Sequence, residues 1–574
     1  MATEGPRRGG TLRLVGAGDV DHLDPALAYH TVTRGIVRAL TRQLVTYASS
    51  RSLATTAVIV PDLATAADGP VDEQGRVYRF TLKEGVRWDA GPRGRAVTAH
   101  DVVRGIKRLA HPMAPSPGLP YYLSTIEGLP EFRAGLLGAD RDVSTIASYL
   151  EDAPVPGVRA EDDRTVVFTT RHPMPDFLNI LALPFATPAP VEYLAYVPGS
   201  PEIEQRLLSN GPYRVARYVP GSEILLERNP VWEPATDQLR PSYIDAIRVV
   251  EGLTEERSYQ LVMSGAADML WDIQPPTDRL PELFATGDPR LEICPAGLLS
   301  PYLVINFLSP TQDRALARHA VRQALQYAVD KAAVSLVWGG PRLNDIAEQI
   351  LPPLCTAHRP ARPYATRGGR GDPARARQLL AEAGYPDGLE LRLVFRDRDI
   401  HPETARAVRD GLARAGIHVQ LLPVSINDLF ASYLGSVPAA REGRWDLALT
   451  GWEPDWHGNN GRVYLQALFD SSGADADDWG TNFGHYRSDT TNKLLQAALT
   501  SPDRTRADAL FREAEAEVMQ DCAIVPILFA HQYWLHAHRV RNWQPYPVLN
   551  GDLTGLWLDP PLPATGSIDG SEHD

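Results

Sequence analysis

The chain has 574 residues, too many for a single hydrophobic core, so two or three domains are expected. Its composition, with 44% hydrophobic and 22% charged residues, is ordinary for a soluble globular protein. No apolar run approaches the length of a membrane-spanning helix, and the formal net charge of −14 argues against nucleic acid or anionic lipid as a partner.

The first third of the chain alternates strands with helices. Residues 9–29 open with a strand and break at a Leu-Asp-Pro turn, and the apolar spacing over 31–47 predicts a helix. Residues 77–82 are predicted as a strand. Thr98 is expected to cap the following helix, with Asp101 three residues later completing a capping box. These signals indicate a mixed α/β fold.

The middle of the chain continues this alternation. A strand over 244–250 precedes a helix over 254–265, and a buried strand over 302–307 precedes an amphipathic helix over 315–331. Residues 372–384 read as a helix that begins with Asp-Pro and ends at glycine. A helix and two flanking strands are predicted over 402–416, 389–395 and 419–423.

Residues 444–465 combine a strand with a loop rich in binding chemistry. Alternation from Trp445 predicts a half-buried strand that Gly451 and Pro454 end. The loop beyond it contains Trp452, Glu453, Asp455, Trp456, His457, Asn459 and Asn460. Two indoles beside two carboxylates suit a ligand with an ammonium group and an apolar body. The alternative is a surface loop whose tryptophans fill a gap and whose aspartate caps a turn.

Several segments together resemble one family. TGWEPDWHGN is similar to the ligand loop of the family 5 extracellular solute-binding proteins, the peptide, dipeptide and nickel receptors of ABC importers. FTLKEGVRWDAGPRGRAVTAHDV and DPARARQLLAEAG match further words of this family in the right order. One departure is an insertion at residues 91–95, where the family has a tight turn. The resemblance spans about residues 9–560.

The resemblance implies an α/β, two-lobed periplasmic-binding-protein-like fold (type II, cluster C), with an extra small N-terminal subdomain and a hinge. The chain crosses between lobes near Cys294. The expected division is lobe I from 9–55, 165–293 and 526–562, the subdomain from 56–164, lobe II from 294–525, and a disordered tail from 563–574.

The function implied is that of an ABC-transporter substrate-binding protein. It would capture a peptide-like or other small polar ligand between its lobes and deliver it to a membrane permease, as a monomer without cofactor or metal. By position, Asp455 would hold the amino terminus of a peptide. The ligand-binding residues expected are Asp455, Trp452, Trp456, His457, Asn459 and His485.

An alternative function comes from the start of the chain. MATEGPRRGG has neither an apolar signal core nor a lipobox cysteine. Either the protein is extracellular and anchored through a segment removed from this chain, or it is cytoplasmic from Met1. In the second case the scaffold could serve as an enzyme or metabolite-binding protein in a biosynthetic pathway.

The sequence favours a binding protein over an enzyme without deciding between them. It contains no GxSxG, HExxH, P-loop or GxGxxG pattern that would place catalytic groups at a defined spacing. In the enzyme alternative the acid/base candidates are Glu453, Asp455, His457 and His485. The three cysteines form no zinc-like pattern, so one disulfide is possible, involving Cys294 or Cys522, and none is required.

Overall fold

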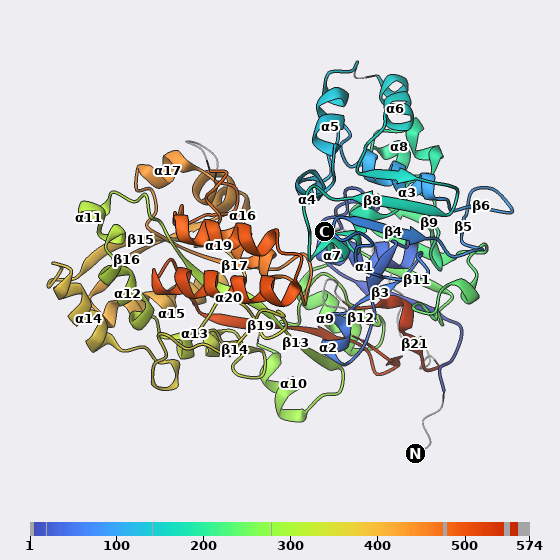
Figure 1. Cartoon of the computed structure of the whole chain (residues 1–574). Helices are drawn as coiled ribbons and strands as arrows, with labels where there is room; N and C mark the ends of the chain where they lie inside the picture. Colours follow the sequence, from blue (N-terminus) through green and yellow to red (C-terminus); the bar gives the residue numbers. More distant parts are fainter. Residues whose placement is uncertain are drawn as a thin grey trace. The chain divides into compact units, whose positions relative to one another are not determined.

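The computed structural model describes residues 5–18, 20–140, 142–276, 278–474, 479–544 and 551–560. The chain divides into two compact units, the first made of Met1–Glu292 and Tyr533–Asp574 and the second of Ile293–Gln532. It crosses between them within β13 (Leu291–Ile305) and β19 (Leu528–Leu535), which are neighbours in one sheet (Figure 1). The separate N-terminal subdomain stays a prediction, and the expected tail lies outside the described residues.

A five-stranded sheet is the centre of the first unit. Its order is β12-β1-β11-β10-β9, with β1 parallel to β11 and β12 and with β10 antiparallel to its neighbours. Leu12 and Leu14 of β1 are fully buried on the same face, as a period of two requires. The strands are β1 (Thr11–Val15), β9 (Tyr213–Val219), β10 (Glu223–Arg228), β11 (Ala246–Val250) and β12 (Met269–Leu270).

The helix predicted over 31–47 is shorter in the structure. Helix α1 (Thr31–Leu40) ends where Thr41 becomes extended, and β2 (Val45–Tyr47) then pairs with β3 (Ile59–Pro61). The reason is a long-range one. The guanidinium of Arg42 is buried against Asp62 at 2.8 Å, so this residue leaves the helix to make an ion pair that helical spacing does not reveal.

The N-terminal capping box forms as predicted. Thr98 and Asp101 make both of its hydrogen bonds at the start of α3 (Ala99–Arg108), and the buried Trp88 indole donates to Asp101 at 3.1 Å. The insertion at residues 91–95 connects two short paired strands, β5 and β6. The other elements of this unit are β4 (Val77–Thr81), β5 (Arg87–Trp88), β6 (Arg95–Ala96), β7 (Val158–Ala160), β8 (Thr165–Thr169), α2 (Leu53–Thr56), α4 (Leu119–Thr125), α5 (Leu129–Leu137), α6 (Val143–Asp152), α7 (Phe177–Leu181), α8 (Pro201–Glu204), α9 (Glu255–Met263), α10 (Leu280–Thr286), β20 (Val540–Arg541) and β21 (Trp557–Leu558).

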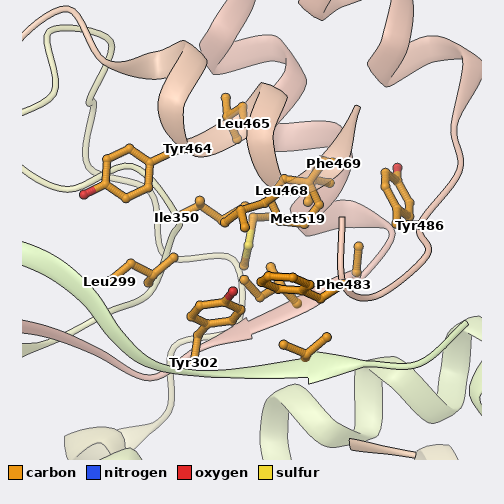
Figure 2. Packing of buried hydrophobic residues seen from close by; sticks show 14 of the residues in the cluster. Leu299, Tyr302, Ile350, Tyr464, Leu465, Leu468, Phe469, Phe483, Tyr486 and Met519 are labelled. Atoms are coloured by element: carbon orange, nitrogen blue, oxygen red, sulfur yellow. The ribbon is translucent and has the colours of Figure 1, made fainter. Parts of the chain in front are cut away.

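The second unit is a seven-stranded mixed sheet covered on both faces. The order is β14-β19-β13-β17-β15-β16, with β18 also paired to β13. Leu303 and Ile305 of β13 belong to one buried cluster, while Tyr302 and Val304 belong to another (Figure 2). Alternate residues of a central strand therefore serve two cores. The remaining strands are β14 (Asn344–Ile346), β15 (Leu389–Arg396), β16 (Ile417–Val424), β17 (Leu447–Trp452) and β18 (Ile524–Pro526).

The helix predicted over 315–331 divides in two. Val329 is extended, and the Asp330 side chain accepts a hydrogen bond from the Ala333 N–H to cap the second helix. The α-helices of this unit are α11 (Thr311–Arg314), α12 (His319–Ala328), α13 (Lys331–Val337), α14 (Pro373–Glu382), α15 (His401–Arg414), α16 (Ile426–Asp428), α17 (Val437–Arg441), α18 (Ala467–Phe469), α19 (Asp489–Leu499) and α20 (Arg504–Gln520).

Candidate functional site: the loop after β17

Strand β17 carries the candidate loop, and it differs from the prediction in two respects. Four consecutive residues, 447–450, are buried, so both faces of the strand are covered, and it lies between β13 and β15 in the sheet. Asp446 just before it is fully buried too, accepting from the Arg392 N–H at 2.7 Å. It also continues through Gly451 to Trp452, which pairs with Leu299. The glycine is explained by a close approach instead of a turn, because a Cβ there would clash with the Ser300 hydroxyl.

Both indoles of the loop are engaged by backbone carbonyls. The half-buried Trp452 donates its N–H to the Val463 carbonyl at 2.8 Å. The Trp456 side chain is fully buried and donates to the Asn459 carbonyl at 2.7 Å, and the Asn460 amide donates back to the Trp456 carbonyl at 2.9 Å. These bonds hold the loop in a compact turn. The ligand role of Trp456 stays a prediction, and its burial favours support of the loop over stacking on a ligand.

A second segment of the same unit braces the loop. The Thr356 N–H donates to the Gly458 carbonyl at 2.8 Å, and Cys355 forms an isolated parallel bridge with Gly458. Gly458 has a φ of +82°, in the left-handed region that favours glycine. Burial raises the pKa of the Cys355 thiol to about 12, so this cysteine is a neutral packing group.

The loop leaves its carboxylates more accessible than its other polar groups. His457 is fully buried and Asn459 nearly so, whereas Asp455 is half-buried and Glu453 is exposed, with the Gln532 amide 3.3 Å from the Glu453 carboxylate. A partly accessible carboxylate such as Asp455, next to buried polar side chains, can bind a cation. A rigid loop would present that carboxylate in one position.

The structure separates His485 from this loop. Gly484 accepts a hydrogen bond from Phe307, beyond the end of β13 that pairs with Leu447, whereas Trp452 pairs with Leu299 toward the other end. Leu299 and Ile305, the ends of the paired stretch, are six residues apart, which is about 20 Å at about 3.3 Å per residue along a strand.

The His485 imidazole has a structural environment of its own. It is buried 5.3 Å from the Trp479 ring, and burial, with the nearby charge of Arg441, lowers its pKa to about 4. Its backbone also has a φ of +57°, in the left-handed region. Its neighbour Gly484 thus lies beside one end of β13 and Trp452 beside the other, and the ligand roles of His485 and Asp455 stay predictions.

The comparisons with known proteins identify the family. The model of the bacterial extracellular solute-binding proteins, family 5 (middle), matches residues 58–475. The chain belongs to this family. The periplasmic oligopeptide-binding protein OppA of Salmonella typhimurium is 27% identical over 474 residues, which cover 82% of this chain and 78% of that protein.

Two further relatives of this solute-binding protein are comparably similar. The probable deoxycholate-binding periplasmic protein YgiS of Escherichia coli is 26% identical over 467 residues, covering 79% of this chain and 77% of the other. The structure of Clavulanic acid biosynthesis oligopeptide binding protein 2 has a TM-score of 0.83 at 28% identity, and the match covers 96% of both chains. The predicted two-lobed α/β fold of the family is confirmed.

Sequence reasoning missed residues that pack around the candidate loop. Tyr464 is fully buried next to the loop, its pKa is raised well above its usual value by burial, and its hydroxyl has no hydrogen-bond partner among the residues that the structure describes. The bracing residues Cys355 and Thr356 lie about a hundred positions before the loop. No local spacing links them to it, so only an alignment or a structure could have found them.

Other features of the solute-binding protein are negative within the described ranges. There, no group of three His, Cys, Asp or Glu side chains is placed to hold a metal ion. No helix in those ranges is both long enough and apolar enough to cross a membrane. The three cysteines are all buried and free of disulfides.

Proposed function

We propose that this solute-binding protein captures a peptide or peptide-like ligand through the ligand's ammonium group and delivers it to an ABC permease. The observation that carries the proposal is Asp455, the half-buried carboxylate of a loop whose histidine and asparagine side chains are buried. Two of the relatives, OppA and the clavulanic acid protein, have oligopeptide-binding names, which supports a ligand of this class.

The physical basis is a charge-assisted contact in a preformed loop. A carboxylate that accepts from an ammonium group gains more than a neutral hydrogen bond, and the gain increases as water is excluded. The bonds of Trp452 and Trp456 to backbone carbonyls fix the loop before the ligand arrives, so little conformational entropy is lost on binding. The apolar edge of the half-buried Trp452 can contact a ligand side chain without selecting one.

The test pairs Asp455→Asn with Glu453→Gln. Ligands are first found by thermal shift across di- to pentapeptides, amino-acid derivatives, opines, sugars, nickel chelates and deoxycholate. Calorimetric titration of an amine-bearing ligand should then show binding weakened by ~2–5 kcal/mol for Asp455→Asn, the scale for breaking a buried charge pair. Glu453→Gln should cost little, because Glu453 is exposed.

Two results would count against this assignment. Equal losses at both positions would indicate a diffuse negative field instead of a specific contact. No loss at Asp455 would indicate a ligand without an amino group, such as a sugar or a bile acid.

Membership of the family also bears on where the protein acts and on the alternative function. Membership of an extracellular family favours solute capture outside the membrane over a cytoplasmic enzyme or metabolite-binding protein. We also propose that the protein is attached to the membrane by a lipid anchor and works with a permease. The genomic sequence around Met1 tests them: a signal with a lipobox cysteine and adjacent permease genes is expected, and a native Met1 among biosynthetic genes would favour the alternative.

A further inference from the structure

A groove on the second unit lies outside the candidate loop. It is formed by residues 349–364 on one side and by α20 on the other, and it holds about 1100 Å³ of empty space, including its open side. All of its lining residues belong to this unit. The side chains that matter for its chemistry are Arg359, Arg362, Arg512, Glu515, Tyr364 and Met519.

The walls of the groove are held in place. The Gln349 side chain accepts from the Ala361 N–H at 2.6 Å, and the Tyr364 hydroxyl donates to the Met519 carbonyl at 3.0 Å. Glu515 ties the two walls together, accepting from the Ile350 N–H at 2.8 Å. The groove is therefore preformed.

Three guanidinium groups from both walls line this groove with most of their donors unused. Arg359 donates to the backbone carbonyl of His358 at 2.6 Å, and Arg512 reaches only the Ala357 carbonyl at 3.5 Å. Arg362 is 3.9 Å from Glu348 and 71% exposed. Among the residues that the structure describes, Arg362 has only this long ion pair, and Arg359 and Arg512 have none, although the charges of both act on the pKa of Asp508 on α20.

The floor of the groove is a carboxyl group with weakened charge. Glu515 is buried, and burial raises its pKa to about 7 although it accepts hydrogen bonds from two backbone N–H groups and the Gln349 amide. At neutral pH it is therefore protonated in a substantial part of the molecules. Tyr364, Met519 and two prolines supply apolar surface beside it.

We propose that this groove is a second binding site, for a small organic anion that carries a carboxylate on an apolar body. Guanidinium groups match a carboxylate with paired donors, and the apolar wall suits the rest of the molecule. The site is distinct from the loop that carries Asp455, so this inference goes beyond the proposed function. The arginines of this chain are numerous, and it is their convergence on one preformed groove that carries the inference.

The test uses phenylacetate and octanoate as probes and phenylacetamide as the uncharged match for the first. Calorimetric titration of the full chain at millimolar probe should detect binding of both anions, with phenylacetamide at least about tenfold weaker. The double substitution Arg359→Gln/Arg512→Gln should weaken the anions by a similar factor. Arg506→Gln is the control, because Arg506 lies on the same helix, is 59% exposed and is 3.7 Å from Glu513.

A second measurement keeps the inference testable if the double variant is unstable. Hydrogen exchange of the wild-type chain with and without octanoate should show added protection over residues 357–364 and 508–520. Asp455→Asn should leave both the protection and the affinity unchanged, which separates this site from the proposed peptide site. No protection in these ranges, equal binding of phenylacetamide, or equal loss in Arg506→Gln would overturn the assignment.

Discussion

Asp62 in the first unit and Glu515 in the second are both buried carboxyl groups, and burial alone raises the pKa of each. The charges of Arg240 and Arg42, at 2.7 and 2.8 Å, outweigh burial at Asp62 and hold its pKa well below the usual range. Glu515 has only N–H donors of neutral groups, and its pKa stays raised, at about 7. Two guanidinium charges compensate for the loss of hydration at Asp62. At Glu515 the hydrogen bonds from neutral N–H groups do not compensate for that loss.

The difference separates scaffold from site. Around Asp62 the network closes on itself, because Arg240 also pairs with Asp237 at 3.2 Å and donates to the Arg38 carbonyl at 3.1 Å. Nothing further is needed to neutralise it. Around Glu515, by contrast, no guanidinium or ammonium group among the described residues forms an ion pair with the carboxyl group, and Arg359, Arg362 and Arg512 line the groove beside it. A buried carboxylate that is paired with guanidinium groups, like Asp62, stabilises the fold. A buried carboxyl group without a counter-charge, like Glu515, can change its charge when a proton or a ligand binds nearby.

The largest effect is expected from breaking the closed network. Asp62→Asn leaves two fully buried guanidinium groups with too little negative charge, and removing one partner of such a pair costs about 3–5 kcal/mol. Urea unfolding followed by hydrogen exchange should show the loss in peptides of β2, β3 and α1. Glu84→Gln, which removes a 78% exposed partner of Arg164, should cost less than about 1 kcal/mol. Similar losses in both variants would mean that the network contributes little net stability.

A smaller, pH-dependent effect is expected at Glu515. Its folded pKa of about 7 exceeds the usual glutamate value of 4.5, so the folded chain binds more protons than the unfolded chain between these values. Stability from this group is present below pH 4.5 and is lost as pH rises toward 7, by an amount on the order of 3 kcal/mol. Glu515→Gln should remove this slope, as measured by urea unfolding of both proteins from pH 5 to 8.

The groups that face Glu515 must be controlled in that experiment. His358 is hydrogen-bonded to Gln349, Arg359 and Arg362 line the facing wall, and Arg512 lies on the same helix. Arginines keep their charge over this range. Repeating the comparison in a His358→Asn background isolates the carboxyl group. Parallel pH profiles for the wild type and the Glu515→Gln variant in both backgrounds would contradict the raised pKa.

The sequence could predict whatever depends on neighbouring residues. The capping box of Thr98 and Asp101 forms, and the Asp372 side chain accepts from the Arg375 N–H to start α14 as expected. The period of two marked β17 correctly as a strand, because alternation depends only on local geometry. The prediction that Gly451 ends the strand was wrong, because this glycine is explained by the close approach of Ser300, which is far away in the chain.

Contacts between distant segments could not be predicted. Strand β13 begins well before the predicted residues 302–307 and contains two prolines, which argue against a central strand when read alone. The pairing of Arg42 and Arg240 with Asp62 has no local signal. His485 was expected near the ligand from the family resemblance of its Asn482-Phe483 neighbours, and only the hydrogen bond from Phe307 to Gly484, read with the pairing of β13 and β17, places that segment beside the end of β13 away from Trp452.

The smallest effect tests the same contrast with two buried tyrosines. In the first unit the Tyr213 hydroxyl donates to the Ile244 carbonyl at 2.9 Å, whereas in the second unit the Tyr302 hydroxyl has no hydrogen-bond partner among the described residues. Figure 2 shows the Tyr302 hydroxyl directed into a cluster of apolar side chains. Tyr213→Phe should therefore cost about 1 kcal/mol, because a buried carbonyl loses its donor.

Tyr302→Phe should be neutral or stabilise the chain by up to about 1 kcal/mol, because it removes a hydroxyl that burial penalises without compensation. Urea midpoints of the two variants and the wild type, measured with matched slopes, give the comparison. A loss at Tyr302 as large as that at Tyr213 would mean that a water molecule satisfies the hydroxyl. Such a water would bind in the small cavity lined by Tyr302, Phe483 and Tyr486. The pair of substitutions therefore decides whether the Tyr302 hydroxyl is left without a hydrogen bond or is hydrogen-bonded to a buried water.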